Sequence, residues 1–190
     1  MSQPLSLEQI LLKICDLLDR LRIRGALIGG LAVATWGSPR TTEDIDLLAE
    51  MTPSAEIDAA FRTEGWHPSW HHGGSEDPIP LLLRLKGGHG VPEIEVICAT
   101  RSWERAMLGR AVRIVLPRGS RVPVVAPADL IVLKLLAGGP QDLVDVADLL
   151  RRCGAMPELE KRAAERGVLD LLRRVRETVE TNQGSEQEDE

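Results

Sequence analysis

The stretch GGLAVATWGSPRTTEDIDLL, residues 29–48, decides how the fold of this chain is interpreted. It follows the short apolar run Ala26–Ile28, which is typical of a buried strand. Residues 30–36 suit a short helix, and the segment EDIDLLA, residues 43–49, alternates between apolar and polar side chains as a strand does. The chain is therefore expected to run from a strand through a glycine pair into a short helix, and then into a second strand.

Two aspartates lie in that second strand, separated by one apolar residue. Asp44 and Asp46 are expected to share one face, because successive side chains of a strand point to opposite faces. Adjacent carboxylates repel each other and favour a counter-charge. Divalent metal supplies it, since carboxylate oxygens are ligands that Mg²⁺ prefers. We expect the pair to hold Mg²⁺ (or Mn²⁺); the alternative is a polar strand face in solvent.

The glycine pair Gly29-Gly30 lies where the first strand is expected to end and the short helix to begin. Glycine has no side chain, so its backbone N–H groups can come close to a phosphate, and a helix N-terminus favours an anion. Both glycines are therefore expected to bind the phosphates of a nucleotide.

This string resembles the nucleotidyltransferase superfamily with the DNA polymerase β-like fold, whose signature is Gly-Gly or Gly-Ser, a spacer and an apolar-flanked D-x-D. It looks most like the AbiEii-type branch of toxin nucleotidyltransferases. The R-x-T-x-D-x-D pattern of that branch is matched by Arg40, Thr42, Asp44 and Asp46. The resemblance covers roughly residues 25–152. It implies an enzyme that moves a nucleoside monophosphate from an NTP to an acceptor.

The resemblance also implies further residues of the nucleotide and metal sites. Ser38, Arg40 and Thr42 are expected in the nucleotide site. A third carboxylate is expected on a neighbouring strand, where PEIEVICAT offers Glu93 and Glu95 on one face. We prefer Glu95 because apolar residues surround it, although relatives more often carry Asp. The expected catalytic and metal-binding residues are Asp44, Asp46 and Glu95.

Lys134 lies in the otherwise apolar segment DLIVLKLLA, residues 129–137. Its ammonium group either reaches solvent along the helix surface or meets an anion. The resemblance implies that Lys134 contacts the triphosphate and that Asp142 and Asp145 belong to the same nucleotide-binding set. Relatives often carry an arginine near Gly139, where this chain has Gly-Gly-Pro.

The whole chain reads as a mixed sheet followed by helices, which is an α+β architecture. Of its 190 residues, 43% are hydrophobic and 27% charged, a balance that suits one globular protein with two lobes. We expect a nucleotidyltransferase core at 1–126, a helical C-terminal lobe at 127–180 and a disordered acidic tail at 181–190. The stretch 66–77, rich in Gly, His and Ser, is expected to be a loop.

The cysteines and the hydropathy of the sequence predict the cellular compartment. The chain has three cysteines without C-x-x-C spacing, which favours free thiols over a disulfide framework or a zinc site. No basic region followed by an apolar stretch stands at the start of the sequence, and no apolar run reaches membrane-spanning length. The cytoplasm is the expected compartment, with no membrane partner.

The distribution of charge along the sequence is the observation that bears on the acceptor. Residues 101–121 carry six arginines against Glu104, in a chain of net charge -6. A basic segment favours a phosphate-rich acceptor, although a solvated surface explains it equally well. With the toxin resemblance, this favours RNA, namely the 3′ end of tRNA, and an antitoxin protein as partner. The alternatives are a small-molecule nucleotidyltransferase of the antibiotic-modifying kind and a degenerate nucleotide-binding regulatory module.

Overall fold

The computed structural model describes residues 5–38, 42–74, 77–88, 90–116 and 118–188. It has the mixed sheet and flanking helices expected from the sequence. The chain divides into two compact units. Unit 1 consists of Met1–Ala32 and Thr41–Val125, and unit 2 of Val33–Arg40 and Ala126–Glu190.

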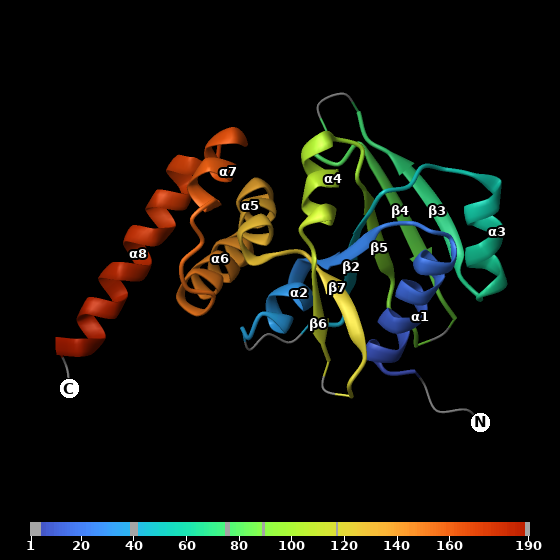
Figure 1. Ribbon diagram of the computed structural model, residues 1–190, viewed down its shortest axis with the longest axis horizontal. Helices are drawn as coiled ribbons and strands as arrows, with labels where there is room; N and C mark the ends of the chain where they lie inside the picture. The colour runs from blue at the N-terminus through green and yellow to red at the C-terminus, as the bar shows by residue number, and fades with distance from the viewer. Residues whose placement is uncertain (1–4, 39–41, 75–76, 89, 117, 189–190) are drawn as a thin grey trace. The chain divides into compact units, whose positions relative to one another are not determined.

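Unit 1 is built on a seven-stranded sheet with the order β3-β4-β5-β2-β1-β7-β6 (Figure 1). Its β2 is parallel to β5 and its β1 is parallel to β7, while the other neighbouring pairs are antiparallel. The strands are β1 (Gly25–Ile28), β2 (Ile45–Ala49), β3 (His67–His72), β4 (Leu81–Lys86), β5 (Ile94–Cys98), β6 (Val112–Val115) and β7 (Arg121–Val124). The sheet is mixed, as expected.

Helices α1 (Leu7–Arg20) and α3 (Ala55–Thr63) pack on the same face of this sheet. Leu18 of α1 lies so close to Gly25 that a Cβ there would be 2.8 Å from Leu18 Cδ1. Trp70 of β3 donates a hydrogen bond from Nε1 to Asp58 Oδ1 of α3, at 2.8 Å. Helix α4 (Ser102–Gly109) also belongs to this unit.

The two faces of the sheet differ in chemistry. On the face beneath α1 and α3, Leu47, Leu83 and Val96 are fully buried. The opposite face carries charged side chains on three adjacent strands, because Asp46 pairs in register with Glu95 and Glu95 pairs with Arg84. These three residues are only partly buried. A hydrophobic core on one side thus fixes a polar row on the other.

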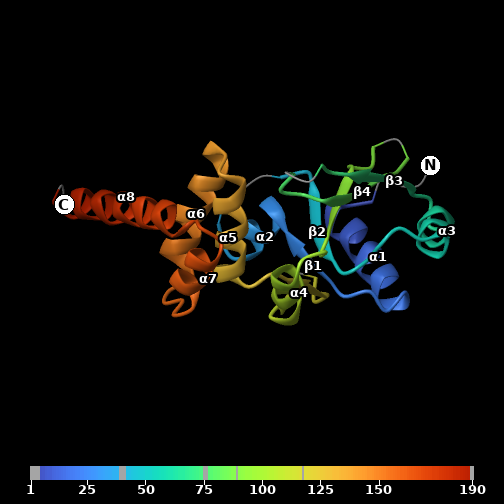
Figure 2. The same cartoon turned by 90° about the horizontal axis from the view of Figure 1, so that it is seen from above.

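Unit 2 is helical. It contains α5 (Pro127–Ala137), α6 (Pro140–Arg152), α7 (Leu159–Glu165) and α8 (Leu169–Glu188), and α2 (Gly29–Thr35) begins in unit 1 and ends in unit 2. Helix α5 packs against α6 and α7, and α8 packs against the same two helices. Figure 2 shows α8 running beyond the other helices of its unit. Among the residues described, no helix combines the length and apolar character needed to cross a bilayer.

One expectation about the elements is wrong, and two further observations concern the division of the chain. The stretch 66–77 contains strand β3 rather than loop alone, because its alternate residues pack on α3 through Trp70. Helix α8 extends as far as Glu188, past the start of the acidic tail that we expect at 181–190. The expected boundary near 126 stays a prediction, and Val33–Arg40 is grouped with the helices of unit 2 rather than with unit 1.

Candidate active site

The glycine pair meets the second aspartate at the end of β1. Gly29 follows Ile28 with φ +66, in the left-handed region that favours glycine. A Cβ at Gly29 would lie 1.9 Å from Asp46 Oδ2, so the Asp46 carboxylate occupies the space of the missing side chain. Gly30 is the second residue of α2. The conformation and the close approach together require glycine at position 29.

Asp46 and Glu95 are direct neighbours across β2 and β5. Side chains in register on adjacent strands point to the same face, and the strands are about 4.8 Å apart. Asp44 lies one residue before β2 instead of inside it, and its side chain is exposed. The backbone N–H of Asp44 donates a hydrogen bond to Thr42 Oγ1 at 3.4 Å, which links these two residues just before β2 begins. The structure thus brings Gly29, Asp46 and Glu95 together, with Asp44 just before them.

A basic side chain on β4, which the sequence did not single out, completes this row. Arg84 Nε donates to Glu95 Oε1 at 2.8 Å and lies 3.5 Å from Glu93 Oε1. Lys86 Nζ lies 3.6 Å from Glu93 Oε2. Both acids that competed for the third catalytic position are therefore paired with cations. The signal in the sequence was the alternation of LLLRLK, which places Arg84 and Lys86 on the polar face.

The carboxylates suit a hard cation in their chemistry. Asp46 and Glu95 offer oxygen donors from adjacent strands, which Mg²⁺ and Mn²⁺ accept. Yet no three His, Cys, Asp or Glu side chains within the described part of the chain are grouped closely enough to hold a metal ion. The hydrogen bond from Arg84 to Glu95 gives a physical reason for this absence, because it holds the Glu95 carboxylate against Arg84.

Ser38, expected at the nucleotide, hydrogen-bonds within unit 2. Its side chain is buried, and its Oγ donates to Asp148 Oδ2 at 2.7 Å. Asp148 Oδ1 also accepts from Arg151 Nη1 at 2.7 Å. A serine hydroxyl has one proton to donate, and in this arrangement the Ser38 hydroxyl donates it to Asp148. Arg40, also expected at the nucleotide, lies outside the described residues.

Lys134, Asp142 and Asp145 form one buried cluster in unit 2. Lys134 Nζ lies 2.8 Å from Asp142 Oδ1 and 2.8 Å from Asp145 Oδ2. The residue Lys134 is 8% exposed and Asp145 is 2% exposed. Asp142 also accepts from the backbone N–H of Gly139 at 3.1 Å, at the start of α6. The sequence reading placed these three residues in one set, and the structure adds that they join α5 to α6 through ion pairs.

The arginines of 101–121 do not behave alike. Arg101 bonds Glu104 and the carbonyl of Pro78, and Arg105 donates to the carbonyl of Thr100. Arg118 Nε lies 3.8 Å from Glu8 Oε2. Part of this basic segment therefore holds the fold together, so its net charge alone does not locate an acceptor.

The cysteines offer no ready nucleophile. Burial raises the pKa of Cys15 to about 12, with Asp19 and Asp16 adding to the rise. Burial likewise raises the pKa of Cys98 to about 12. A thiol with so high a pKa is protonated at neutral pH, which disfavours covalent catalysis by either residue.

Comparison with known proteins relates this geometry to a fold. No protein-family model matches the chain, and no curated protein matches it. Among solved structures, an antigenic nucleotidyltransferase-like protein from Paracoccidioides brasiliensis is 20% identical, with TM-score 0.54 over 92% of this chain and 95% of that one. ANT(2″)-Ia in complex with adenylyl-2″-tobramycin is 18% identical, with TM-score 0.53 over 83% of this chain and 95% of that one. A putative nucleotidyltransferase from Thermotoga maritima is 20% identical, with TM-score 0.52 over 77% of this chain and 91% of that one.

These likenesses agree with the mixed sheet of unit 1 and the helices that accompany it. At such low identity they speak for architecture and not for substrate. The chain has the nucleotidyltransferase fold.

Proposed function

We propose that this protein is a nucleotidyltransferase that moves a nucleoside monophosphate from an NTP to a hydroxyl group of an acceptor. One observation carries the proposal: Asp46 lies against Gly29 and in register with Glu95, on the polar face of a sheet with this fold. Nothing in the packing of the sheet requires two adjacent carboxylates there, because the buried face supplies the core. Their use in catalysis accounts for the arrangement.

In the reaction, the acceptor oxygen attacks the α-phosphorus of the NTP. The bond from that phosphorus to the bridging oxygen of the β-phosphate breaks, the proton of the acceptor hydroxyl is removed, and pyrophosphate leaves. Asp44, Asp46 and Glu95 would hold Mg²⁺ or Mn²⁺, which supplies counter-charge and Lewis acidity to phosphate oxygens when bound. The chain itself contributes position: the Gly29 turn keeps the Asp46 carboxylate fixed.

We also propose roles for the other residues that were expected at the nucleotide site, and each role rests on a different observation. Gly29 and Gly30 offer main-chain N–H groups to phosphate oxygens. Thr42 acts through the backbone of Asp44, and Ser38 through Asp148, so we assign both a positioning role. Lys134, Asp142 and Asp145 are proposed for nucleotide binding on the strength of the sequence resemblance. An ammonium group has three donors, and two ion pairs leave one for a phosphate.

For the acceptor we propose the 3′ end of an RNA, with tRNA as the first candidate. The polar face supports an anionic acceptor over a polycationic one, because Arg84 and Lys86 already neutralise Glu95 and Glu93. A toxin-like role restrained by an antitoxin protein rests on the resemblance of residues 29–48 to the AbiEii-type branch. A small-molecule acceptor is the second candidate, favoured by the likeness to the fold of ANT(2″)-Ia.

The test offers each α-labelled NTP with Mg²⁺ to three acceptors: purified tRNA, total cellular RNA and tobramycin. Wild type is compared with Asp46→Asn and with Asp170→Asn, a control that removes an exposed carboxylate on α8. The proposal requires label in RNA from wild type and the control, and none from Asp46→Asn. Label in tobramycin alone would establish the small-molecule activity. No label with any NTP would leave the degenerate regulatory module as the reading.

The toxin role has its own experiment. Wild type and Asp46→Asn are expressed from an inducible promoter at equal protein levels. Arrest of growth by wild type alone supports the role, whereas equal growth of both strains rejects it.

A further inference from the structure

A hollow of about 330 Å³ lies in unit 1 where β1 begins. It is formed by the end of α1, the turn from α1 to β1, the end of α4, and strands β6 and β7. Its charged lining consists of Arg22, Arg24, Arg113 and Asp19, and Leu108 and Pro123 belong to its apolar wall. We call this the arginine hollow. Its volume is at the lower end of the range for pockets that bind small ligands.

The arginine hollow is remote from the catalytic row. Gly25 of the hollow opens β1, whereas Gly29 follows the other end of that strand. At about 3.3 Å per residue, the two glycines are about 13 Å apart. The hollow therefore belongs to the opposite end of the sheet from Asp46.

The charges of the arginine hollow are unevenly matched. The positive charge of Arg24 is balanced by Glu50, because Arg24 Nη2 donates a hydrogen bond to the Glu50 carboxylate at 2.5 Å. Within the described residues, neither the Arg22 nor the Arg113 side chain makes a hydrogen bond or an ion pair, although the backbone N–H of Arg22 donates to the Asp19 carbonyl at 3.0 Å. Helices α1 and α4 end nearby, and helix C-termini favour cations, which explains some of the basic charge. It does not explain why the Arg22 and Arg113 guanidinium groups line one hollow whose lining has a single acid, Asp19, because like charges repel unless enough anionic charge lies among them.

The backbone at Arg22 adds to this. Arg22 has φ 57 and is the one non-glycine residue with positive φ among the residues described. The position after a helix end in this conformation is usually glycine. Here a long basic side chain lines the hollow in spite of the backbone strain, and within the described ranges no hydrogen bond or ion pair of that side chain offsets the strain.

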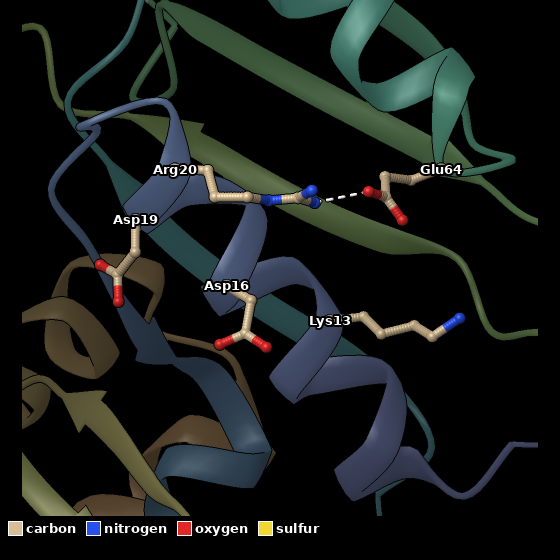
Figure 3. A pocket seen from close by; sticks show the side chains of 5 residues that line it. All are labelled: Lys13, Asp16, Asp19, Arg20 and Glu64. Atoms are coloured by element: carbon tan, nitrogen blue, oxygen red, sulfur yellow. Dashed lines mark hydrogen bonds and ion pairs between the residues drawn. The ribbon is translucent and has the colours of Figure 1, made fainter.

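A neighbouring hollow makes the contrast. It is lined by Lys13, Asp16, Asp19, Arg20 and Glu64 (Figure 3). Its Arg20 donates to Glu64, and this hydrogen bond lowers the pKa of the glutamate. Three acids face two bases there, so that hollow does not select an anion.

We propose that the arginine hollow binds a phosphate-bearing anion. Its phosphate oxygens accept hydrogen bonds from Arg22 and Arg113, since guanidinium groups match phosphate geometry. Leu108 and Pro123 contact the group attached to the phosphate. The phosphate comes either from an RNA backbone or from a free anion such as pyrophosphate. The proposal concerns binding alone and goes beyond the proposed transfer reaction, because it requires no turnover.

The test compares wild type with the double variant Arg22→Ala/Arg113→Ala and with Arg173→Ala/Arg174→Ala, which removes the same charge from the exposed surface of α8. Binding of a fluorescein-labelled single-stranded RNA of sixteen nucleotides is followed by anisotropy, and binding of inorganic pyrophosphate by calorimetry. Both are measured with EDTA present, so that metal-dependent binding at the carboxylates is suppressed. Melting temperatures are recorded first and should not fall, since neither arginine side chain makes a hydrogen bond or an ion pair with the residues that the structure describes.

The double variant is expected to lose about tenfold or more in affinity, because two charge-assisted hydrogen bonds are removed, while the control changes little. A loss for RNA, with the salt slope of binding reduced by about 1.4, identifies an RNA backbone as the source of the phosphate. A loss for pyrophosphate alone identifies a free anion. Unchanged affinity for both probes, or no binding of either by wild type, overturns the proposal.

Discussion

Arg84 Nε lies 2.8 Å from Glu95 Oε1 and 3.5 Å from Glu93 Oε1, so one guanidinium group serves both Glu95 of β5 and Glu93, which directly precedes that strand. Only Glu95 is also the register partner of Asp46. The two glutamates thus share Arg84 as their counter-ion. They differ in position, because Glu95 lies directly opposite Asp46 on the neighbouring strand, whereas Glu93 lies two residues earlier in the chain. This difference is the reason why we propose Glu95 rather than Glu93 as the third catalytic acid.

Glu95→Gln should reduce nucleotidyl transfer by about 100-fold or more, the scale of losing one group that stabilises transition-state charge. Glu93→Gln keeps Glu95 in place and should stay within about threefold of wild type. The measurement is the initial rate of label incorporation at saturating NTP. If Glu93→Gln proves the more damaging of the two, the register argument for Glu95 fails.

Gly29→Ala should abolish transfer. The new Cβ would meet Asp46 Oδ2 at 1.9 Å, so either the turn or the carboxylate must move. Gly65→Ala is the matched control, because Gly65 also has positive φ, at +87, with open space around it. It should cost about 1 kcal/mol of stability through backbone strain and leave the rate intact. Rates and urea midpoints of both variants decide the matter, and an active Gly29→Ala enzyme would contradict the close packing.

Lys134→Met should destabilise the protein by about 3–5 kcal/mol, because it leaves two aspartates of unit 2 without their cation. Adding Asp145→Asn to Lys134→Met removes the more deeply buried of those charges and should recover much of the loss. Urea denaturation measures both variants. Loss of NTP affinity in Lys134→Met is interpretable only after this control, since unfolding alone would produce it. A stability of Lys134→Met equal to wild type would show that the ion pairs contribute little.

Thiol reactivity should follow burial. At pH 8 the raised pKa values of Cys15 and Cys98, about 12 each, keep both thiols protonated and slow to react with a disulfide reagent such as DTNB. Burial raises the pKa of Cys153 as well, but this residue is more accessible. We expect one slow equivalent from Cys153, absent in Cys153→Ser, and three equivalents in urea. Rapid reaction of Cys98 in the folded protein would refute its burial.

The sequence was most informative where a local pattern decides the structure. The alternation around Asp46 and the glycine turn before it predicted β1, α2 and β2 within a few residues. Strand β3 was missed because HPSWHH contains a proline and three histidines, and its alternation matters only once Trp70 packs on α3. The pairing of Asp46 with Glu95 depends on a parallel contact between distant segments, which periodicity does not encode.

The same limit applies to side chains whose partners are remote in the chain. Nothing near Ser38 in the sequence points to Asp148, and nothing near Glu95 announces Arg84 as its partner. Resemblance to a family suggested which residues are functional, and the structure adds which of them are already engaged.

The position of β1 in the sheet has a consequence for synthesis on the ribosome. Leu27 pairs on one side with Leu47, which follows soon afterwards, and on the other with Val124, which emerges much later. Until then β1 presents an unpaired edge of apolar residues to the cell, the kind of edge that invites wrong partners. Such long-range pairing also slows the final step of folding. We therefore expect newly made chains to need a chaperone until β7 has left the exit tunnel.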